Sequence, residues 1–339
     1  MPSVRLFVCC VIFLFAATAN AAVPIKSHLD VVWAKPDGFT LTADIHVPEA
    51  GQKSYPVLII YHGGGWLLNS KSIMDDMARY MAAEGQYVVV NVNYRLLADQ
   101  NNTVALNKII EDAMGAVLWV KDHIHHYNGD PGKIAITGDS AGGHLASMVM
   151  LAGKNLESDS FAGASLGFNP SYLPNGKTAE QVAANDGLRV QAVILSYTAF
   201  DLTGMAQGGF ESEQNPFWGW AKAKPRGVFG DGITFAARPD FYQAASPVLH
   251  IPRAKDYKLP PQFVHVGSED GLTTPALAKD YVKRLKKAGQ PAELKIYPKL
   301  GHGFLDSGCN DYTNGCFADL AVPTLKDMIK FLDRVFARK

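Results

Sequence analysis

The chain contains 339 residues, in which 32 lysines and arginines balance 32 aspartates and glutamates, so its formal net charge is zero. This balance, without a long run of like charge, argues against a nucleic-acid partner and against an anionic membrane surface. The length suits one large domain or two small ones, and a hydrophobic content of 47% is ordinary for a globular protein.

The first residues have the pattern of a secretory signal peptide. Arg5 supplies a positive charge, residues 6–17 form an apolar run, and Ala19-Asn20-Ala21 fits an A-x-A cleavage site. We predict a signal peptide over residues 1–21, cleavage after Ala21, and a secreted or periplasmic protein without stable membrane insertion. Retention of this segment as an anchor is the alternative, although the apolar run is short for a transmembrane helix.

After the leader, the hydrophobic pattern predicts a β-hairpin followed by alternating strands and helices. The hairpin covers residues 29–34 and 39–47, and a continuous apolar strand follows at 56–61. The later predicted helices lie at 73–83, 103–127, 145–151, 275–288 and 323–337, and the later predicted strands at 87–92, 133–137, 191–196, 262–266 and 292–297. This alternation predicts an α/β fold in which helices cover both faces of a mostly parallel sheet.

Two segments rich in glycine and proline interrupt the alternation, near residues 153–189 and 204–245. The second carries several aromatic residues, which form either an apolar cover over a cleft or a satellite cluster packed on the sheet. Neither segment is long enough for a separate domain. We therefore predict one domain over residues 22–339, with two inserted cap segments.

Ser140 lies between two glycines, in the segment Gly138-Asp139-Ser140-Ala141-Gly142-Gly143-His144. A predicted buried strand precedes this segment and a predicted helix follows it. That context fits the nucleophile elbow of the G-x-S-x-G form, in which a tight turn exposes the serine hydroxyl at a helix N-terminus. The pattern alone is weak, because glycine and serine are common, and an ordinary helix cap is the alternative. The interpretation therefore depends on partners elsewhere in the chain.

Two such partners follow later strands. Asp270 follows the strand at 262–266, and His302 follows the strand at 292–297. A serine attacks only if a base removes its proton, and an imidazole base needs a carboxylate that holds its tautomer. Since the carboxyl ends of parallel strands meet at one edge of a sheet, Ser140, Asp270 and His302 are predicted to form a catalytic triad.

Other residues compete for the roles of acid and base. Asp201 and Glu269 are alternatives to Asp270, of which Asp201 is the better placed. His144, His250 and His265 are alternatives to His302, but His265 lies within a predicted strand and His144 on the helix after the serine. These positions favour packing roles.

Three glycines in the segment His62-Gly63-Gly64-Gly65-Trp66 follow the buried strand at 56–61. Acyl transfer places negative charge on a carbonyl oxygen, and backbone N–H groups can approach that oxygen closely only where side chains leave room. We predict that the N–H groups of Gly64, Gly65 and Ala141 form the oxyanion hole. The alternative, a flexible loop, does not explain the three glycines at this position.

The remaining cysteines and histidines carry two further predictions. Cys309 and Cys316 are the only cysteines outside the leader, and in an exported chain we expect them to form a disulfide. His123, His125 and His126 could suggest a metal site, but no cysteine lies nearby and no H-E-x-x-H pattern is present. A solvated helix end is the favoured interpretation, and no metal or cofactor is predicted.

With these residues in place, the chain resembles the α/β-hydrolase superfamily, and within it the hormone-sensitive-lipase-like and bacterial feruloyl-esterase-like esterases. The segments that carry the resemblance are His62 to Trp66, Asn93-Tyr94-Arg95-Leu96, Glu111-Asp112-Ala113, Gly129-Asp130-Pro131, Gly138 to Gly143, Ser246-Pro247, Leu259-Pro260-Pro261 and Gly301-His302-Gly303-Phe304. The short, strand-like stretch before His62 leaves too little chain for a helical cap, which favours the feruloyl-esterase-like group.

The resemblance implies an eight-stranded, mostly parallel sheet, the triad Ser140, Asp270 and His302, and no cofactor. The expected activity is that of a serine carboxylesterase acting on short-chain, acetyl or hydroxycinnamoyl esters, of small molecules or linked to carbohydrate. Two alternatives stay open: amide or peptide hydrolysis by the same triad, and a non-catalytic binding protein that keeps the fold. The oligomeric state is not predicted.

Overall fold

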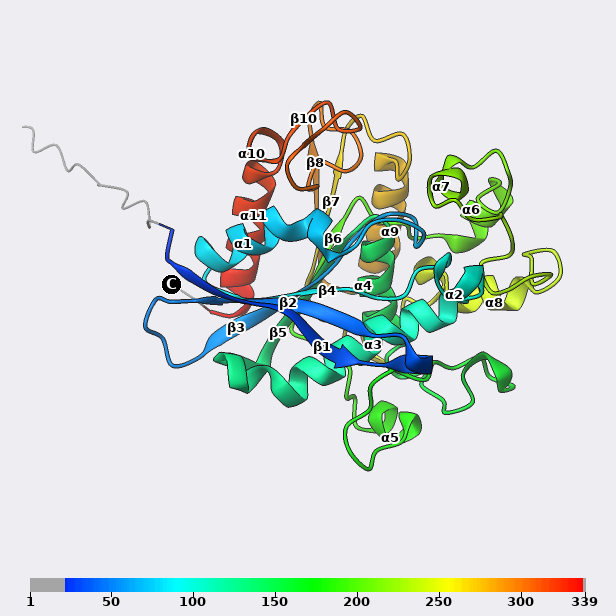
Figure 1. The fold of residues 1–339 in the computed structure, drawn as a ribbon, viewed down its shortest axis with the longest axis horizontal. Helices are drawn as coiled ribbons and strands as arrows, with labels where there is room; N and C mark the ends of the chain where they lie inside the picture. Colours follow the sequence, from blue (N-terminus) through cyan, green and yellow to red (C-terminus); the bar gives the residue numbers. More distant parts are fainter. Residues whose placement is uncertain (1–21, 338–339) are drawn as a thin grey trace, which may run out of the picture.

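The computed structural model describes residues 22–337, so the predicted signal peptide lies outside the described residues. The fold is built on one eight-stranded sheet with the order β1-β2-β4-β3-β5-β6-β7-β8 (Figure 1). The strands are β1 (Ile25–Ala34), β2 (Leu41–Pro48), β3 (Tyr55–Tyr61), β4 (Val88–Val92), β5 (Gly129–Asp139), β6 (Ala192–Ser196), β7 (Gln262–Gly267) and β8 (Ala292–Tyr297). β1 pairs with β2, and β2 with β4, in antiparallel fashion, and the other pairs are parallel. The predicted mostly parallel α/β sheet is confirmed.

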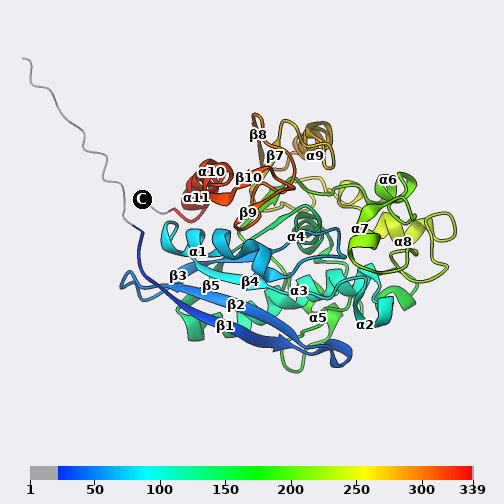
Figure 2. The same ribbon diagram turned by 45° about the horizontal axis from the view of Figure 1, so that its top comes forward.

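Helices cover both faces of this sheet. α1 and α11 pack against each other on one face, whereas α3, α4 and α9 pack on the other (Figures 1 and 2). The helices are α1 (Asp75–Ala83), α2 (Asp99–Asn102), α3 (Leu106–His123), α4 (Ala141–Ala152), α5 (Ala179–Ala184), α6 (Leu202–Gln207), α7 (Pro216–Trp220), α8 (Pro239–Ala244), α9 (Pro275–Lys287), α10 (Phe317–Leu320) and α11 (Val322–Val335). Within residues 22–337, no helix combines the length and the apolar character needed to cross a membrane.

The central strands form the core. Every residue of β3 and β4 is buried, as expected for strands covered by helices on both faces. β5 begins at Gly129, four residues before the predicted strand, because Gly129 pairs with Tyr55 of β3. The predicted helix at 103–127 is shorter than expected, since its last turn is a separate 3-10 segment, Ile124–Tyr127.

The two interrupting segments occupy different places. The segment that contains α5 packs beside α3, where Ser160 Oγ donates a hydrogen bond to the buried Glu111. The later segment forms α6, α7 and α8, which gather in one lobe at the side of the molecule opposite α1 and α11 (Figures 1 and 2). A small hairpin of β9 (Cys309–Asn310) and β10 (Gly315–Cys316), closed by the Cys309–Cys316 disulfide, was not predicted as a hairpin.

One buried ion pair connects the segment after β4 to α3. The guanidinium of Arg95, just after β4, donates from Nε and Nη2 to the two carboxylate oxygens of Asp112, each at 2.8 Å. Both side chains are nearly inaccessible to water, whereas Asp37, which pairs with Arg95 Nη1 at 2.7 Å, is exposed. Fork-to-fork geometry makes such a pair strong, and its burial makes the loss of one partner costly.

We expect Arg95→Met to lower the free energy of unfolding by about 3–5 kcal/mol, because it leaves the Asp112 carboxylate buried without its partner. The matched control is Asp37→Asn, which removes the exposed member of the same network and is expected to cost less than about 1 kcal/mol. Urea unfolding followed by circular dichroism measures both. Equal losses in the two variants would contradict the stabilising role of the buried pair.

Candidate active site

Ser140 occupies the turn between β5 and α4 in a strained backbone conformation, with φ 51° and ψ −116°. The turn is held by hydrogen bonds on both sides: the Ser140 N–H donates to the Ser196 carbonyl at 2.9 Å, and the His144 N–H to the Ser140 carbonyl at 3.1 Å. Gly142 lies so close to β3 that a Cβ there would be 2.0 Å from the Tyr61 carbonyl oxygen. The strand–turn–helix context predicted for Ser140 is therefore present.

Asp270 and His302 are in direct contact. His302 Nδ1 lies 2.8 Å from Asp270 Oδ2, and Asp270 Oδ1 also accepts the backbone N–H groups of Leu272 and Thr273, both at 2.8 Å. Burial alone would raise the pKa of Asp270, but the hydrogen bond and charge of His302, together with the two N–H donors, hold it below its ordinary value. The acid thus stays ionised, which suits a carboxylate that orients an imidazole.

Thr273 connects this pair to the cavity beside Ser140. Its hydroxyl donates to the Tyr197 carbonyl at 2.6 Å and lies 3.2 Å from His302 Nδ1. Thr273 and Ser140 both line one cavity. The cavity therefore extends from Ser140 to Thr273, the residue that contacts the Asp–His pair, although these residues follow separate strands.

The rival acids and bases have other partners. Asp201 caps α6 by accepting the Gly204 N–H at 3.0 Å, and Glu269 is exposed.

The buried His144 contacts the Ala245 carbonyl at 2.8 Å, and the buried His265 contacts the Ser196 hydroxyl at 2.9 Å. Burial lowers the pKa of His144 to about 4 and that of His265 to about 3, so both are neutral core histidines at pH 7. His250 contacts the Gln243 carbonyl at 2.9 Å.

The glycine segment after β3 lies at the same end of the sheet. Gly64 and Gly65 both have positive φ, 118° and 61°, and Gly65 and Ala141 line the cavity next to Ser140. The buried His62 stacks on Tyr94 with ring centroids 4.3 Å apart, and the Tyr94 hydroxyl donates to the His62 carbonyl at 2.5 Å. This packing fixes the start of the loop whose N–H groups are the predicted oxyanion donors.

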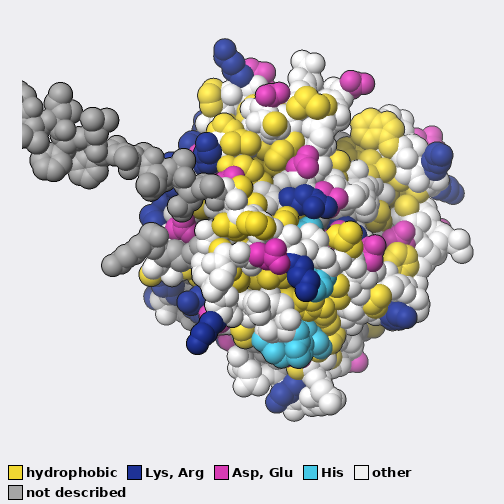
Figure 3. Space-filling model, turned by 60° about the vertical axis from the view of Figure 1, so that its left-hand side comes forward, with side chains coloured by type: hydrophobic (Ala, Val, Ile, Leu, Met, Phe, Trp, Pro, Cys, Tyr) yellow, Lys and Arg dark blue, Asp and Glu magenta, His cyan; other side chains and the backbone are white. Residues whose placement is uncertain are grey.

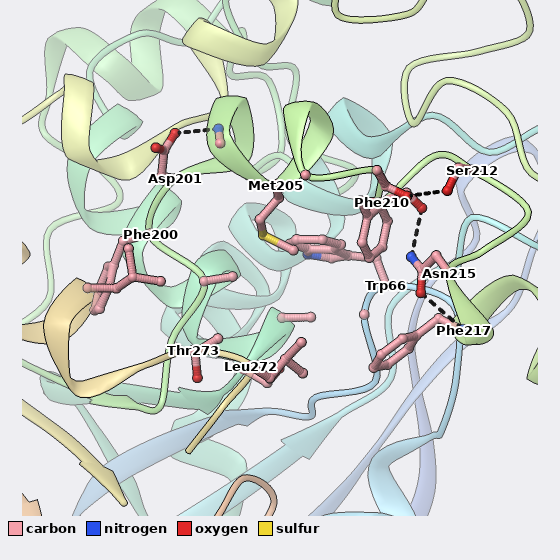
Figure 4. A pocket seen from close by; sticks show the side chains of 18 of the residues that line it. Trp66, Phe200, Asp201, Met205, Phe210, Ser212, Asn215, Phe217, Leu272 and Thr273 are labelled. Carbon is pink, nitrogen blue, oxygen red and sulfur yellow. Dashed lines mark hydrogen bonds between the residues drawn. The ribbon is translucent and has the colours of Figure 1, made fainter. Parts of the chain in front are cut away.

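The cavity itself has a volume of ≈ 560 Å³. Its wall is largely apolar: Figure 4 shows Trp66, Met205 and Phe210 packed beside one another, with Phe217 across from Leu272. Trp66 and Phe210 meet edge to face at 5.5 Å.

Both alternatives for the aromatic segment are thus partly realised, since Phe210 and Phe217 line the cavity while Trp218 is buried in the core. Among the described residues, the wall takes nothing from the segment near 153–189, so only the second of the two predicted cap segments borders this cavity.

The histidines at the end of α3 lie on the surface. Figure 3 shows histidine side chains gathered in one patch, and the rings of the exposed His125 and His126 are 3.9 Å apart. His123 instead stacks on Trp119 at 4.9 Å. Across residues 22–337, no group of three or more histidine, cysteine, aspartate or glutamate side chains is arranged to hold a metal ion.

Sequence reasoning missed a layer of buried groups behind the Asp–His pair. The Tyr197 ring meets the His302 ring at 4.8 Å, and its hydroxyl accepts the Leu305 N–H at 3.3 Å. The Asp139 carboxylate lies against Gly63, where a Cβ would be 2.3 Å from Asp139 Oδ2. Burial, then the charge of Asp306, raises the pKa of Asp139, and burial raises that of Asp306 to about 6. The sequence did offer one sign that these acids belong to the site: Asp139 directly precedes Ser140, and Asp306 lies four residues after His302.

The raised pKa of Asp306 predicts a dependence of stability on pH. The native state binds this proton more tightly than the unfolded chain, whose pKa has the ordinary value of 3.8. The stability that comes from protonated Asp306 is present below that value and is lost as the pH rises through about 6. We expect Asp306→Asn to avoid this loss, so that the variant gains on the order of 1–2 kcal/mol relative to the wild type between pH 4 and pH 8.

Urea unfolding at both pH values measures this gain. Asp311→Asn, which removes an exposed charge from the nearby hairpin, is the matched control. A difference between Asp306→Asn and wild type that does not change with pH would contradict the raised pKa of Asp306.

Comparison with known proteins identifies the family. The family model described as BD-FAE matches residues 43–285. The chain is 31% identical over 281 residues to the "Probable carboxylic ester hydrolase LipM" of Mycobacterium tuberculosis, which covers 82% of this chain and 53% of LipM, so the chain spans about half the length of that relative. Carboxylesterase NlhH of the same organism is 35% identical over 114 residues, covering 33% of this chain and 34% of NlhH.

Solved structures agree in fold. The apo form of Thermogutta terrifontis esterase 2 superposes with a TM-score of 0.63 at 21% identity, covering 95% of this chain and 97% of that one. The butyrate-bound form of the same esterase gives a TM-score of 0.61 at 23% identity and covers 94% of this chain and 95% of that one. The fold is that of these α/β-hydrolase structures, and the sequence resemblance is confirmed: the chain belongs to the BD-FAE family of hormone-sensitive-lipase-like α/β-hydrolases.

Proposed function

We propose that the protein is a serine carboxylesterase that hydrolyses short-chain, acetyl or hydroxycinnamoyl esters through an acyl-enzyme. The observation that carries the proposal is the hydrogen-bonded Asp270–His302 pair, whose neighbour Thr273 lines the same cavity as the strained Ser140. The ester hydrolase and carboxylesterase names of LipM and NlhH support the same reaction class.

In the first half of the proposed reaction, Ser140 Oγ attacks the ester carbonyl carbon and its proton passes to His302 Nε2. Because His302 Nδ1 is bound to Asp270, the imidazole presents Nε2 as the base, and the carboxylate stabilises the imidazolium that forms. The negative oxygen of the tetrahedral intermediate accepts hydrogen bonds from the N–H groups of Gly64, Gly65 and Ala141. The ester C–O bond then breaks, and the alcohol leaves with the proton from Nε2.

In the second half, water replaces the alcohol. His302 Nε2 takes a proton from the water as its oxygen attacks the acyl carbon, and the same proton returns to Ser140 Oγ when the acid is released. The largely apolar wall of Trp66, Met205 and Phe210 keeps bulk water away from the acyl group, which strengthens the electrostatic interactions at the oxyanion.

The cavity supports an acyl side of moderate size. Its volume of ≈ 560 Å³ falls within the range of small-molecule sites and can hold an acetyl, a butyryl or a hydroxycinnamoyl group. Asp201, Ser212 and Asn215 add polar atoms to the apolar wall (Figure 4). We take the substrate to be a small-molecule or carbohydrate-linked ester, and we propose no metal or cofactor.

We also propose that the protein acts outside the cytoplasm, as a secreted or periplasmic enzyme. The sequence pattern of residues 1–21 and the disulfide between Cys309 and Cys316 support this location, because structural disulfides persist in oxidising compartments. Mass determination of the protein exported by its host tests the cleavage after Ala21.

The mature protein is expected to hydrolyse p-nitrophenyl esters with a maximum between acetate and octanoate, and to hydrolyse methyl ferulate. Ser140→Ala is expected to lower kcat by about 10⁴-fold or more, because the nucleophile is lost. Initial rates across the acyl series, and against the matching p-nitroanilides, measure both points. A preference for the anilides would favour the amidase alternative, and turnover that survives in Ser140→Ala would contradict the triad.

Gly65→Ala tests the oxyanion loop. Its Cβ would lie 2.7 Å from the Phe217 ring at a residue with φ 61°, so the loop must shift and the N–H donor with it. We expect kcat to fall by about 10- to 100-fold. The matched control is Gly176→Ala, which also has positive φ but meets open space, and which is expected to leave kcat unchanged. Equal kcat in both variants would contradict the role of the loop.

A further inference from the structure

The two sides of the proposed ester are distinguished by the position of His302. The proton that His302 Nε2 delivers goes to the alcohol oxygen as the C–O bond breaks, so the alcohol part must lie next to the imidazole. We assign the other substituent, the acyl group, to the cavity lined by the oxyanion loop and by Trp66, Phe210 and Phe217. The elements around His302 therefore define the alcohol side, an assignment that rests on the proposed esterase function.

The disulfide hairpin lies on this alcohol side, since it follows His302 in the same loop region after β8 (Figure 2). Its base is anchored to the body of the molecule: the Ser307 N–H donates to the Ile73 carbonyl at 2.8 Å, and the Gly308 N–H to Asp76 Oδ2 at 2.9 Å. The disulfide closes the hairpin, and its turn is held by the Thr313 N–H, which donates to Asn310 Oδ1 at 2.9 Å. The residues of this turn thus have fixed positions near the imidazole of His302, the proposed catalytic base.

Tyr312 is the residue of this turn that faces the site. Its ring lies edge to face with the His302 ring, at 6.5 Å between centroids and 88° between planes. It also packs on Gly303, where a Cβ would be 3.2 Å from Tyr312 Cε1. Yet 58% of Tyr312 is exposed, in contrast to the buried Trp66 of the acyl side. Partial burial, then the charges of Asp270 and Asp306, raises the pKa of Tyr312, so the phenol is neutral at pH 7.

We propose that Tyr312 is a specificity-determining residue for the leaving alcohol. Its exposed ring face packs against a flat, partly apolar ring in the alcohol part, such as an aryl ring or one face of a pyranose, while His302 protonates the alcohol oxygen. Tyrosine suits this place because it offers a large rigid apolar face at low entropic cost and keeps a polar edge in water. The acyl group stays on Ser140 and does not touch this ring.

The test keeps the acyl group constant and varies the alcohol. The substrates are ethyl acetate, benzyl acetate and a monoacetylated methyl glucopyranoside, and the proteins are wild type, Tyr312→Ala, Tyr312→Phe and Asp311→Ala. We expect Tyr312→Ala to lower kcat/KM by about five- to tenfold on the ring-bearing acetates and by less than about twofold on ethyl acetate. Tyr312→Phe keeps the ring face and is expected to retain the activity, as is Asp311→Ala, which alters an exposed neighbour on the same turn.

A loss on benzyl acetate alone would identify an aryl alcohol, and a loss on the glucoside alone a carbohydrate. An equal loss on all three acetates would overturn the proposal, because it would indicate a structural role for the hairpin. Unchanged kcat/KM of Tyr312→Ala on the ring-bearing acetates would also overturn the proposal. A shift in the preference of Tyr312→Ala along the p-nitrophenyl acyl series would overturn it as well. Absence of any turnover that depends on Ser140 in the wild type would instead overturn the esterase function, and melting temperatures identify any variant that fails to fold.

Discussion

The close approach of the α4 N-terminus to β3 is the constraint on which the site depends. A Cβ on Gly142 would lie 2.0 Å from the Tyr61 carbonyl, and one on Gly138 would lie 2.3 Å from the Gly142 carbonyl. Because neither side chain is present, the chain turns within a few residues from strand to helix, and Ser140 takes the strained conformation at that turn. The same approach brings the glycine loop after β3 next to the first N–H groups of α4.

Much of the site could be predicted because the topology does the assembly. Once strands and helices alternate, the carboxyl ends of β5, β7 and β8 must meet at one edge, so contact between Asp270 and His302 follows from their places in the sequence. The chemistry follows from the residue types, because a carboxylate beside an imidazole beyond a serine is typical of a catalytic triad. Local pattern and fold rules agree here, which is the condition under which inference from sequence works best.

What could not be predicted depends on contacts between distant segments. β5 starts earlier than its apolar run because pairing with Tyr55 recruits Gly129, and no periodicity shows this pairing. Asp139 at the end of β5 and Asp306 in the loop after His302 are charged residues near glycines, which sequence patterns assign to solvent. Asp139 is buried against Gly63 and Asp306 is half-buried, and both placements follow only from contacts between segments that are distant in the sequence. Which insertion lines the cavity also depends on tertiary anchoring, although the aromatic residues of the second were a signal in the sequence.

That anchoring explains how an irregular segment can form a defined wall. The guanidinium of Arg226 donates to the carbonyls of Asn102, Leu97 and Val104, at 2.7 to 2.9 Å, and so ties the aromatic lobe to the chain before α3. Trp218 Nε1 donates to the Phe210 carbonyl at 2.8 Å and fixes the residue that faces Trp66. These hydrogen bonds therefore hold the lobe of α6, α7 and α8 in a defined position, although its helices are short.

The difference between the packed apolar cavity wall and the exposed ring of Tyr312 has a physical consequence for the selectivity of the proposed esterase. A wall of packed apolar side chains discriminates by volume, since an acyl group too large for it must displace packed aromatic side chains. A single exposed ring imposes no such limit, and it discriminates only by the surface it buries, a smaller free energy. In the proposed esterase, the arrangement therefore predicts an upper limit on the size of the acyl group and graded selection among alcohols.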